Sequence, residues 1–228
     1  MSPAQPDVAM RRSPLFETQR KGVVAFGDVD GWQMPLVFDN IKMEYLAAKG
    51  TVAVVDRSHH GSLRITGGKR LDLLNRITTN DLRSMGAGTG CQTAMLTDKG
   101  RILDDLRLYA REEFLWLVTS PGAEVRVRGH IEKLRFRDDV TVADATGETA
   151  MIALLGPQSA HLLEAAAHVK GLADLKLHHS VDLSANGARF TAAKRADIGG
   201  AGFNLIVEAS AAASLWLELL GHGGPYGA

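Results

Sequence analysis

The sequence has almost none of the residues that build covalent or metal-linked scaffolds. Of 228 residues only Cys91 is a cysteine, so the chain alone forms neither a disulfide framework nor a multi-cysteine metal site. Lys and Arg number 26, as do Asp and Glu, so the formal charge is zero and gives no overall attraction to nucleic acid or to an anionic membrane. We therefore expect a protein of a reducing compartment, the cytoplasm, without a bound metal.

Long hydrophobic runs are also missing. No stretch approaches the roughly 20 consecutive apolar residues that a spanning helix needs. The first residues, MSPAQPDVAMRRSPLF, contain three prolines and lack the apolar region of a signal peptide, so residues 1–14 are expected to form a loose leader. With 45% hydrophobic and 23% charged residues, the chain as a whole has the composition of a folded globular protein.

The residue pattern predicts strand pairs separated by single helices. Helices are expected over residues 39–50, with Asp39 as the cap, and over residues 69–79, 158–169 and 210–221. A further helix is expected to start with Ser120 as the cap and Pro121 in the first turn, and to run to about Leu134. Alternating apolar residues predict the strands, over 62–67, 91–96, 101–109, 112–119, 140–144, 151–156, 188–193 and 203–209. This order favours an α+β fold of split-βαβ (ferredoxin-like) antiparallel sheets with helices packed on one face.

Two adjacent aspartates stand inside one predicted strand, ILDDLRLY. Side chains alternate across a strand, so Ile102, Asp104, Leu106 and Leu108 share one face and Asp105 lies on the other. The first face is more apolar and is predicted to be the core face. Because the two carboxylates point in opposite directions, they cannot form a dyad that shares a proton.

The residues alone leave two interpretations of Asp105 open. Its carboxylate pairs with a nearby arginine on a wet sheet surface, or it lines a binding pocket. Other polar motifs favour plain structural interpretations: the pairs His59–His60 and His178–His179 as turn residues, GGAG as a hairpin turn, and the basic run from Arg126 to Arg137 as a solvated helix face.

Residues 98–109, DKGRILDDLRLY, resemble the G-x-x-x-D-D-L segment of the folate-binding family that includes the glycine-cleavage T protein (aminomethyltransferase) and the YgfZ-type proteins. Further segments resemble that family in the same order: GWQMPLVF, EYLAA, DRSHHGSLRITG, TTNDL, LLGPQSA and GGAGFNLIVEAS. The chain is identified as a member, closer to the YgfZ branch. The resemblance implies a T-protein-like fold without the C-terminal barrel domain, with a first subdomain over 15–55 plus 145–228 and a second over 56–144.

The resemblance also implies a site for tetrahydrofolate or a one-carbon-substituted folate. Asp105 matches the aspartate beside the folate nitrogens and is the expected catalytic and cofactor-binding residue. Gln92 and Thr119 stand where the T proteins have a tyrosine and an asparagine, and Asn204 replaces an acidic pterin anchor. Trp32 is the aromatic residue expected to stack on the pterin.

Three functions follow from this resemblance as expectations. The first is a YgfZ-like, folate-dependent role in iron–sulfur protein maintenance or tRNA modification. The second is aminomethyl or methyl transfer to tetrahydrofolate, favoured by Asp105 and disfavoured by Gln92, Thr119 and Asn204. The third is a non-catalytic folate-binding module, since the YgfZ hallmark K-G-C-Y-x-G-Q-E is not in the sequence. That absence implies a C-terminal part or a protein partner that completes the protein.

Overall fold

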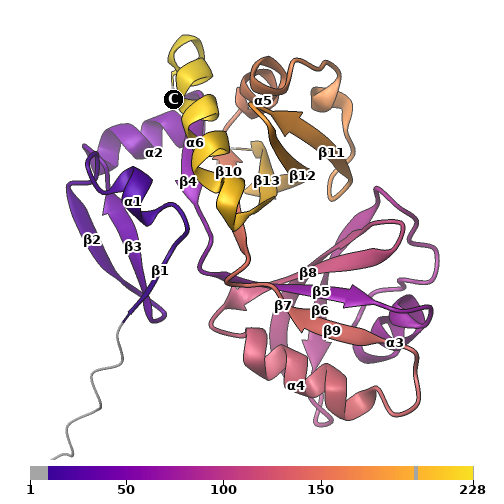
Figure 1. The fold of residues 1–228 in the computed structure, drawn as a ribbon. Coiled ribbons are helices and arrows are strands. Elements are labelled where there is room, and N and C mark those ends of the chain that lie inside the picture. Colours follow the sequence, from indigo (N-terminus) through magenta and orange to yellow (C-terminus); the bar gives the residue numbers. More distant parts are fainter. Residues whose placement is uncertain (1–9, 198–199, 228) are drawn as a thin grey trace, which may run out of the picture.

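The computed structural model describes residues 10–197 and 200–227. Most of the predicted leader, residues 1–9, and the first glycine of the predicted GGAG turn, Gly199, lie outside them. The other three residues of GGAG belong to strand β13 (Gly200–Glu208) and pair with residues 195–197, so they do not form the predicted turn. These described residues form one three-stranded and two five-stranded sheets, and helices lie beside them (Figure 1).

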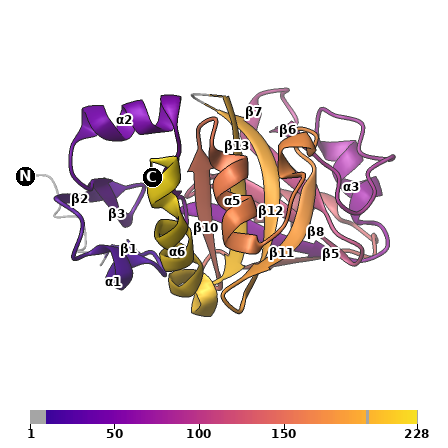
Figure 2. The ribbon, with the colours of Figure 1, turned by 90° about the horizontal axis from the view of Figure 1, so that it is seen from above.

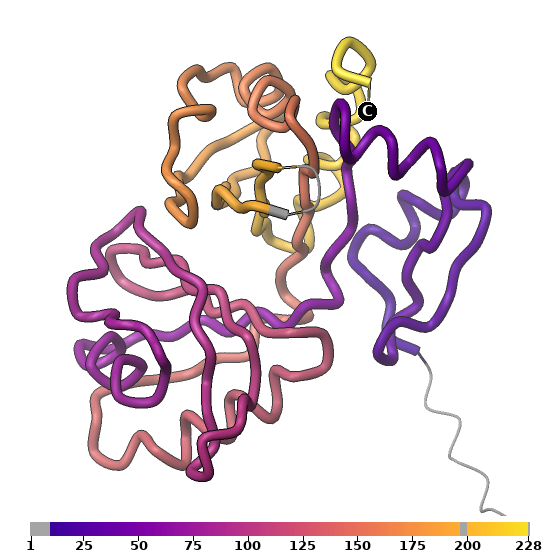
Figure 3. The backbone as a smooth tube through the Cα atoms, turned by 180° about the vertical axis from the view of Figure 1, so that it is seen from behind, coloured from indigo at the N-terminus to yellow at the C-terminus, as the bar shows by residue number. Residues whose placement is uncertain are grey.

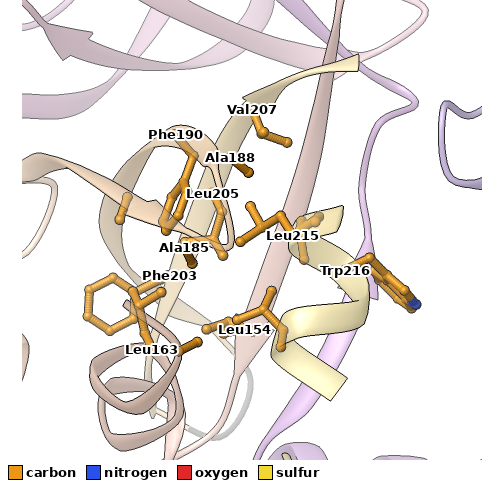
Figure 4. Close-up of a cluster of buried hydrophobic side chains, with 14 of the residues drawn as sticks. Leu154, Leu163, Ala185, Ala188, Phe190, Phe203, Leu205, Val207, Leu215 and Trp216 are labelled. Atoms are coloured by element: carbon orange, nitrogen blue, oxygen red, sulfur yellow. The ribbon is translucent and has the colours of Figure 1, made fainter. Parts of the chain in front are cut away.

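The first five-stranded sheet has the order β11-β12-β13-β10-β4, and every neighbouring pair is antiparallel. Helices α5 and α6 cover one face of it (Figure 2). Phe190, Leu205 and Leu215 point toward one another in this core (Figure 4), and each is at most 4% exposed. The elements are β4 (Ala53–Asp56), β10 (Thr149–Leu155), α5 (Ser159–Ala167), β11 (Ser180–Ala185), β12 (Ala188–Asp197), β13 (Gly200–Glu208) and α6 (Ala209–Gly223).

The second five-stranded sheet has the order β6-β7-β8-β5-β9 and is also antiparallel throughout. Helix α3 follows β5 and helix α4 follows β8, which is the predicted split-βαβ arrangement. Leu74 of α3 and Val127 of α4 pack on the same core as Leu106 and Leu108 of β7. The elements are β5 (His60–Thr66), α3 (Arg70–Ile77), β6 (Gly90–Leu96), β7 (Ile102–Ala110), β8 (Phe114–Pro121), α4 (Glu124–Leu134) and β9 (Thr141–Asp144).

The three-stranded sheet comes from the N-terminal part of the chain, where the sequence analysis predicted no strands. Its order is β1-β3-β2, with β1 and β3 parallel. The indole of Trp216 in α6 stacks on Phe38, with ring centroids 6.2 Å apart, which links this part to the first core. The remaining elements are β1 (Arg11–Arg12), α1 (Phe16–Gln19), β2 (Ala25–Val29), β3 (Trp32–Val37), α2 (Ile41–Gly50) and the 3-10 helices η1 (Leu172–Asp174) and η2 (Gly224–Tyr226).

The structure corrects three predicted helix ends. Helix α2 is capped by Asn40, whose side chain accepts hydrogen bonds from the backbone of Lys42 and Met43, and not by Asp39. Ser120 and Pro121 are the last two residues of strand β8, where Pro121 pairs with His60, and α4 begins three residues later, at Glu124. Helix α6 continues past the predicted stop at residue 221 to Gly223.

The two five-stranded sheets meet through a third cluster of buried side chains, which we call the inter-sheet cluster. Two chain segments, 56–60 and 144–149, connect the sheets (Figure 3). We propose that the chain divides near residues 55 and 145 as predicted, because the strands between these points form one sheet and β4 with β10–β13 the other. The inter-sheet cluster comprises Tyr109, Phe114, Trp116, Val118, Ala145, Met151, Ala193 and Ile206.

Candidate functional site

The two aspartates of β7 point in opposite directions, as predicted. Asp104 is 5% exposed and its Oδ2 accepts a hydrogen bond of 3.0 Å from the backbone N–H of Ser120. Leu106 and Leu108 on the same face are fully buried, which confirms the core face, but Ile102 at the strand end is 71% exposed and was wrongly placed in the core. The buried Asp104 carboxylate therefore satisfies a backbone N–H, whereas the exposed Asp105 carboxylate is accessible to a ligand.

Asp105 lies exposed on the other face of β7, and its partner is an amide. Its Oδ2 accepts a hydrogen bond of 2.7 Å from Nε2 of Gln92 on the neighbouring strand β6. No ion pair of Asp105 occurs within the described residues, so the expected pairing with an arginine is not found. The structure thus brings together two of the predicted site residues, Asp105 and Gln92.

Asn204 lies at the inter-sheet cluster, 2% exposed, and its amide bridges two other polar groups. Its Oδ1 accepts a hydrogen bond of 2.9 Å from Nη1 of Arg195, and its Nδ2 donates to the phenol oxygen of Tyr109 over 3.4 Å. Burial raises the pKa of Tyr109 and lowers that of Arg195 to about 9, so the phenol is protonated at neutral pH. The predicted replacement for the acidic anchor is thus part of a buried hydrogen-bond chain.

Thr119 is fully buried at the end of β8, beside His60. Its backbone oxygen lies 3.0 Å from Nδ1 of His60, and its hydroxyl donates to the backbone oxygen of Ser120. Burial lowers the pKa of His60 to about 3, so the ring is neutral and Nδ1–H is the donor to Thr119. Gly61 permits this approach, because a Cβ there would lie 2.2 Å from Oγ1 of Thr119.

The neutral His60 predicts a loss of stability in mild acid. The unfolded chain binds the proton near pH 6.5 and the native chain only near 3, so the stabilisation is present above pH 6.5 and is lost as pH falls toward 3. Because of this group, we expect the free energy of unfolding to be about 2 kcal/mol lower at pH 5 than at pH 7. Urea unfolding at both pH values measures it: His60→Asn should remove most of this difference, and the exposed control His161→Asn should not. An equal pH dependence in His60→Asn and wild type would contradict the assignment.

Trp32 is buried, and Arg11 links it to the start of α4. It is 3% exposed, and the guanidinium carbon of Arg11 lies 4.1 Å from its ring centroid. Nη1 of Arg11 also forms a 3.0 Å ion pair with Glu124 at the start of α4. One face of the indole is therefore occupied by a protein cation.

Two cavities lie close to these elements. One of about 640 Å³ opens beside the inter-sheet cluster and is lined there by Trp116 and Ile206. Another of about 380 Å³ lies between the N-terminal part and the first sheet, lined by Phe38 and Trp216 among others. None of the five predicted site residues lines either of these two cavities, and the exposed face of β7 around Asp105 is the candidate site.

Sequence reasoning missed three arginines at the same place. Arg107 follows Asp105 by two residues on the same strand face, Arg195 is 2% exposed on β12, and Arg57 directly follows β4. Charged residues inside otherwise apolar strands were the available signal, because arginine is almost never fully buried without a reason. Only the tertiary structure places them together.

Metal and membrane features are absent from the described part of the chain. Over residues 10–197 and 200–227, no group of three His, Cys, Asp or Glu side chains is arranged to hold a metal ion. Within the same residues, no helix is long and apolar enough to cross a bilayer. His59 lies in the turn between β4 and β5, as predicted, whereas His60 begins β5.

The sequence of this chain matches one known protein family over most of its length. The GCVT N-terminal domain family matches residues 15–228, and the chain belongs to this family. Its sequence is 30% identical over 220 residues to an aminomethyltransferase of Halalkalibacterium halodurans and 29% identical over 228 residues to one of Shouchella clausii. The matches cover 96% and 97% of this chain but 60% of each relative, so the chain spans about 60% of the length of these curated relatives.

Solved structures show the same fold. The glycine cleavage system aminomethyltransferase T of Bartonella henselae aligns with a TM-score of 0.83 at 25% identity, over 93% of this chain and 57% of that one. A chain of the heterotetrameric sarcosine oxidase of Corynebacterium sp. U-96 aligns with a TM-score of 0.62 at 11% identity, over 96% of this chain and 97% of that one, and shares the fold alone. The predicted T-protein family and the α+β fold are thereby confirmed.

Proposed function

We propose that this chain binds tetrahydrofolate or a one-carbon-substituted folate, with Asp105 facing the bound pterin. The observation that carries the proposal is the exposed Asp105 carboxylate, held by Gln92 on the DDL strand of a chain that belongs to the GCVT N-terminal domain family. A carboxylate suits this place because it can accept a proton from a ring nitrogen and stabilise positive charge on a one-carbon unit in transfer. Gln92, Thr119, Asn204 and Trp32 are proposed as further folate-binding residues.

The biological role that we propose is YgfZ-like: folate-dependent maintenance of iron–sulfur proteins or tRNA modification in the cytoplasm, together with a C-terminal part or a protein partner. What supports it is the set of departures from the T proteins at Gln92, Thr119 and Asn204. In particular, the Asn204 amide already bonds Arg195 and Tyr109, and an amide does not offer the two charged acceptors of a carboxylate. A non-catalytic folate-binding module is the simpler form of the same proposal.

Aminomethyl transfer is the second candidate function. It is favoured by the relatives, which bear the name aminomethyltransferase, and by Asp105. Turnover separates it from the first: release of a one-carbon unit from an aminomethyl donor to tetrahydrofolate, abolished in Asp105→Ala, would establish the enzyme. Folate binding without any turnover would favour the binding module.

The test of folate binding is calorimetric titration of tetrahydrofolate and its 5-formyl form into wild type, Asp105→Ala and the exposed control Asp98→Ala. Micromolar binding corresponds to about −8 kcal/mol, and the lost charged hydrogen bond should cost about 1.5 to 3 kcal/mol, a weakening of tenfold or more. The control should bind like wild type. Absence of binding to a wild-type chain whose circular dichroism shows it folded would overturn the proposal.

A further inference from the structure

The cavity of about 640 Å³ lies at the inter-sheet cluster, away from the residues proposed to bind folate. Its volume is that of a small-molecule site, and strands of both sheets line it. On β13, Asn204, Ile206 and Glu208 share one face, so the cavity-lining Glu208 lies roughly 13 Å along the strand from Asn204. Ile206 stands between them. The cavity is therefore a separate place from the face around Asp105.

The inner wall of this cavity is aromatic. Trp116 is 8% exposed and packs edge to face on Phe114, with ring centroids 5.2 Å apart, and both rings line the cavity. Within the described residues the indole N–H of Trp116 donates no hydrogen bond, although it is not sealed from solvent. A buried indole N–H usually has an acceptor, so this donor suits a ligand that brings an acceptor into the cavity.

The rim of the cavity carries two charged side chains of opposite sign. Arg189 of β12 and Glu208 of β13 line it and are exposed. Thr191 pairs with Ile206 in the ladder, so Arg189 and Glu208, each two residues further, lie on the same face of the sheet as these two. In the part of the chain that the structure describes, neither charged side chain forms a hydrogen bond or an ion pair, and Glu208 does not cap α6 although it stands at the cap position.

A third charged side chain of the lining, Asp182 of β11, is already paired. It forms an ion pair with Arg111 and accepts a hydrogen bond of 2.8 Å from Oγ1 of Thr191. It therefore does not compete with Glu208 for a cation. The charges that remain at the rim match a ligand that carries both an anionic and a cationic group.

We propose that this cavity binds a free α-amino acid whose aromatic side chain carries a hydrogen-bond acceptor, as in L-tyrosine. The guanidinium of Arg189 binds the carboxylate, and Glu208 binds the ammonium group. The ring packs against Phe114 and Trp116, and its hydroxyl accepts the indole N–H of Trp116. The site goes beyond the proposed function, since it uses none of the residues proposed to bind folate.

Four probes separate the three contacts. L-tyrosine carries all three groups, L-phenylalanine lacks the hydroxyl, tyramine lacks the carboxylate, and p-hydroxyphenylpropionate lacks the ammonium group. Each is titrated calorimetrically into the wild-type chain without folate, and the ligand-dependent shift of the melting temperature is measured in parallel. We expect L-tyrosine to bind roughly tenfold more tightly than tyramine or p-hydroxyphenylpropionate, and about fivefold more tightly than L-phenylalanine.

Three variants assign the contacts to residues. Arg189→Met should weaken L-tyrosine roughly tenfold and leave tyramine unchanged, whereas Glu208→Gln should weaken L-tyrosine and tyramine and leave p-hydroxyphenylpropionate unchanged. Trp116→Phe should remove the preference for L-tyrosine over L-phenylalanine. Arg126→Met changes an exposed arginine of α4 outside the cavity lining, and this control should bind all probes like wild type.

Absence of L-tyrosine binding to folded wild type at millimolar concentration would overturn the proposal, and so would equal affinities of L-tyrosine for wild type, Arg189→Met and Glu208→Gln. Arg189 and Glu208 are exposed, so their variants keep the test decisive if Trp116→Phe does not fold. Asp105→Ala should bind L-tyrosine like wild type. A chain that binds folate but not L-tyrosine leaves the proposed function standing, and the reverse result leaves the cavity site standing.

Discussion

Leu108→Ala is expected to lower the free energy of unfolding by about 2 to 5 kcal/mol, because it opens a cavity under the DDL strand. Leu108 is fully buried in the core between the second sheet and helices α3 and α4. Ile102→Ala is the matched control: Ile102 belongs to the same strand and the same alternation but is 71% exposed, so its change should stay within about 0.5 kcal/mol. Urea unfolding followed by far-ultraviolet circular dichroism measures both.

A similar loss in the two variants would contradict the arrangement of β7. It would mean that the start of β7, near Ile102, is packed as tightly as the middle of the strand. The difference in burial between Asp104 and Asp105 would then be in doubt. The comparison therefore tests the geometry on which the candidate site depends, separately from any ligand.

Gly67→Ala is expected to destabilise the chain by about 3 kcal/mol, through strain and overlap together. Gly67 has a φ of +103°, a conformation that costs other residues about 1 to 2 kcal/mol. An added Cβ would lie 2.1 Å from the backbone oxygen of Asp139 and 2.9 Å from Cα of Val140, and such overpacking costs about 1 to 3 kcal/mol.

Gly68→Ala is the control for this substitution. A Cβ at Gly68 would meet only Oδ2 of Asp139, at 3.5 Å, an ordinary contact, and the residue has no positive φ. Its unfolding midpoint should therefore stay close to that of wild type. If Gly67→Ala unfolds at the same urea concentration as Gly68→Ala, then the close approach of the β5–α3 turn to residues 139–140 is not as described.

Most of the strands and helices were predictable because their signals are local. The alternation in ILDDLRLY placed Leu106 and Leu108 in the core and separated Asp104 from Asp105, since side-chain direction in a strand depends only on position. The caps were less predictable. Asn40 and Asp39 are both good cap residues in sequence, and only the backbone conformation at Asn40, extended with φ −141°, decides between them.

The N-terminal strands and the end of β8 were missed for a non-local reason. Strand β3 contains a proline, which argues against a strand in sequence, but it is stabilised by pairing with β1 and β2. Likewise Pro121 looked like the first turn of a helix, yet it pairs with His60 in the ladder of β5 and β8. Partner strands distant in the chain outweighed the local propensity in both places.

By itself the sequence determined the α+β class, the core face of the DDL strand, the family and the position of Asp105 on the opposite face, because periodicity and motif order are properties of neighbouring residues. Only the tertiary structure decided that Gln92 donates a hydrogen bond to Asp105 and that Asn204 bonds to both Arg195 and Tyr109. Asn204 and Tyr109 are 95 residues apart in the chain, and their approach follows from the packing of two sheets that no local pattern encodes.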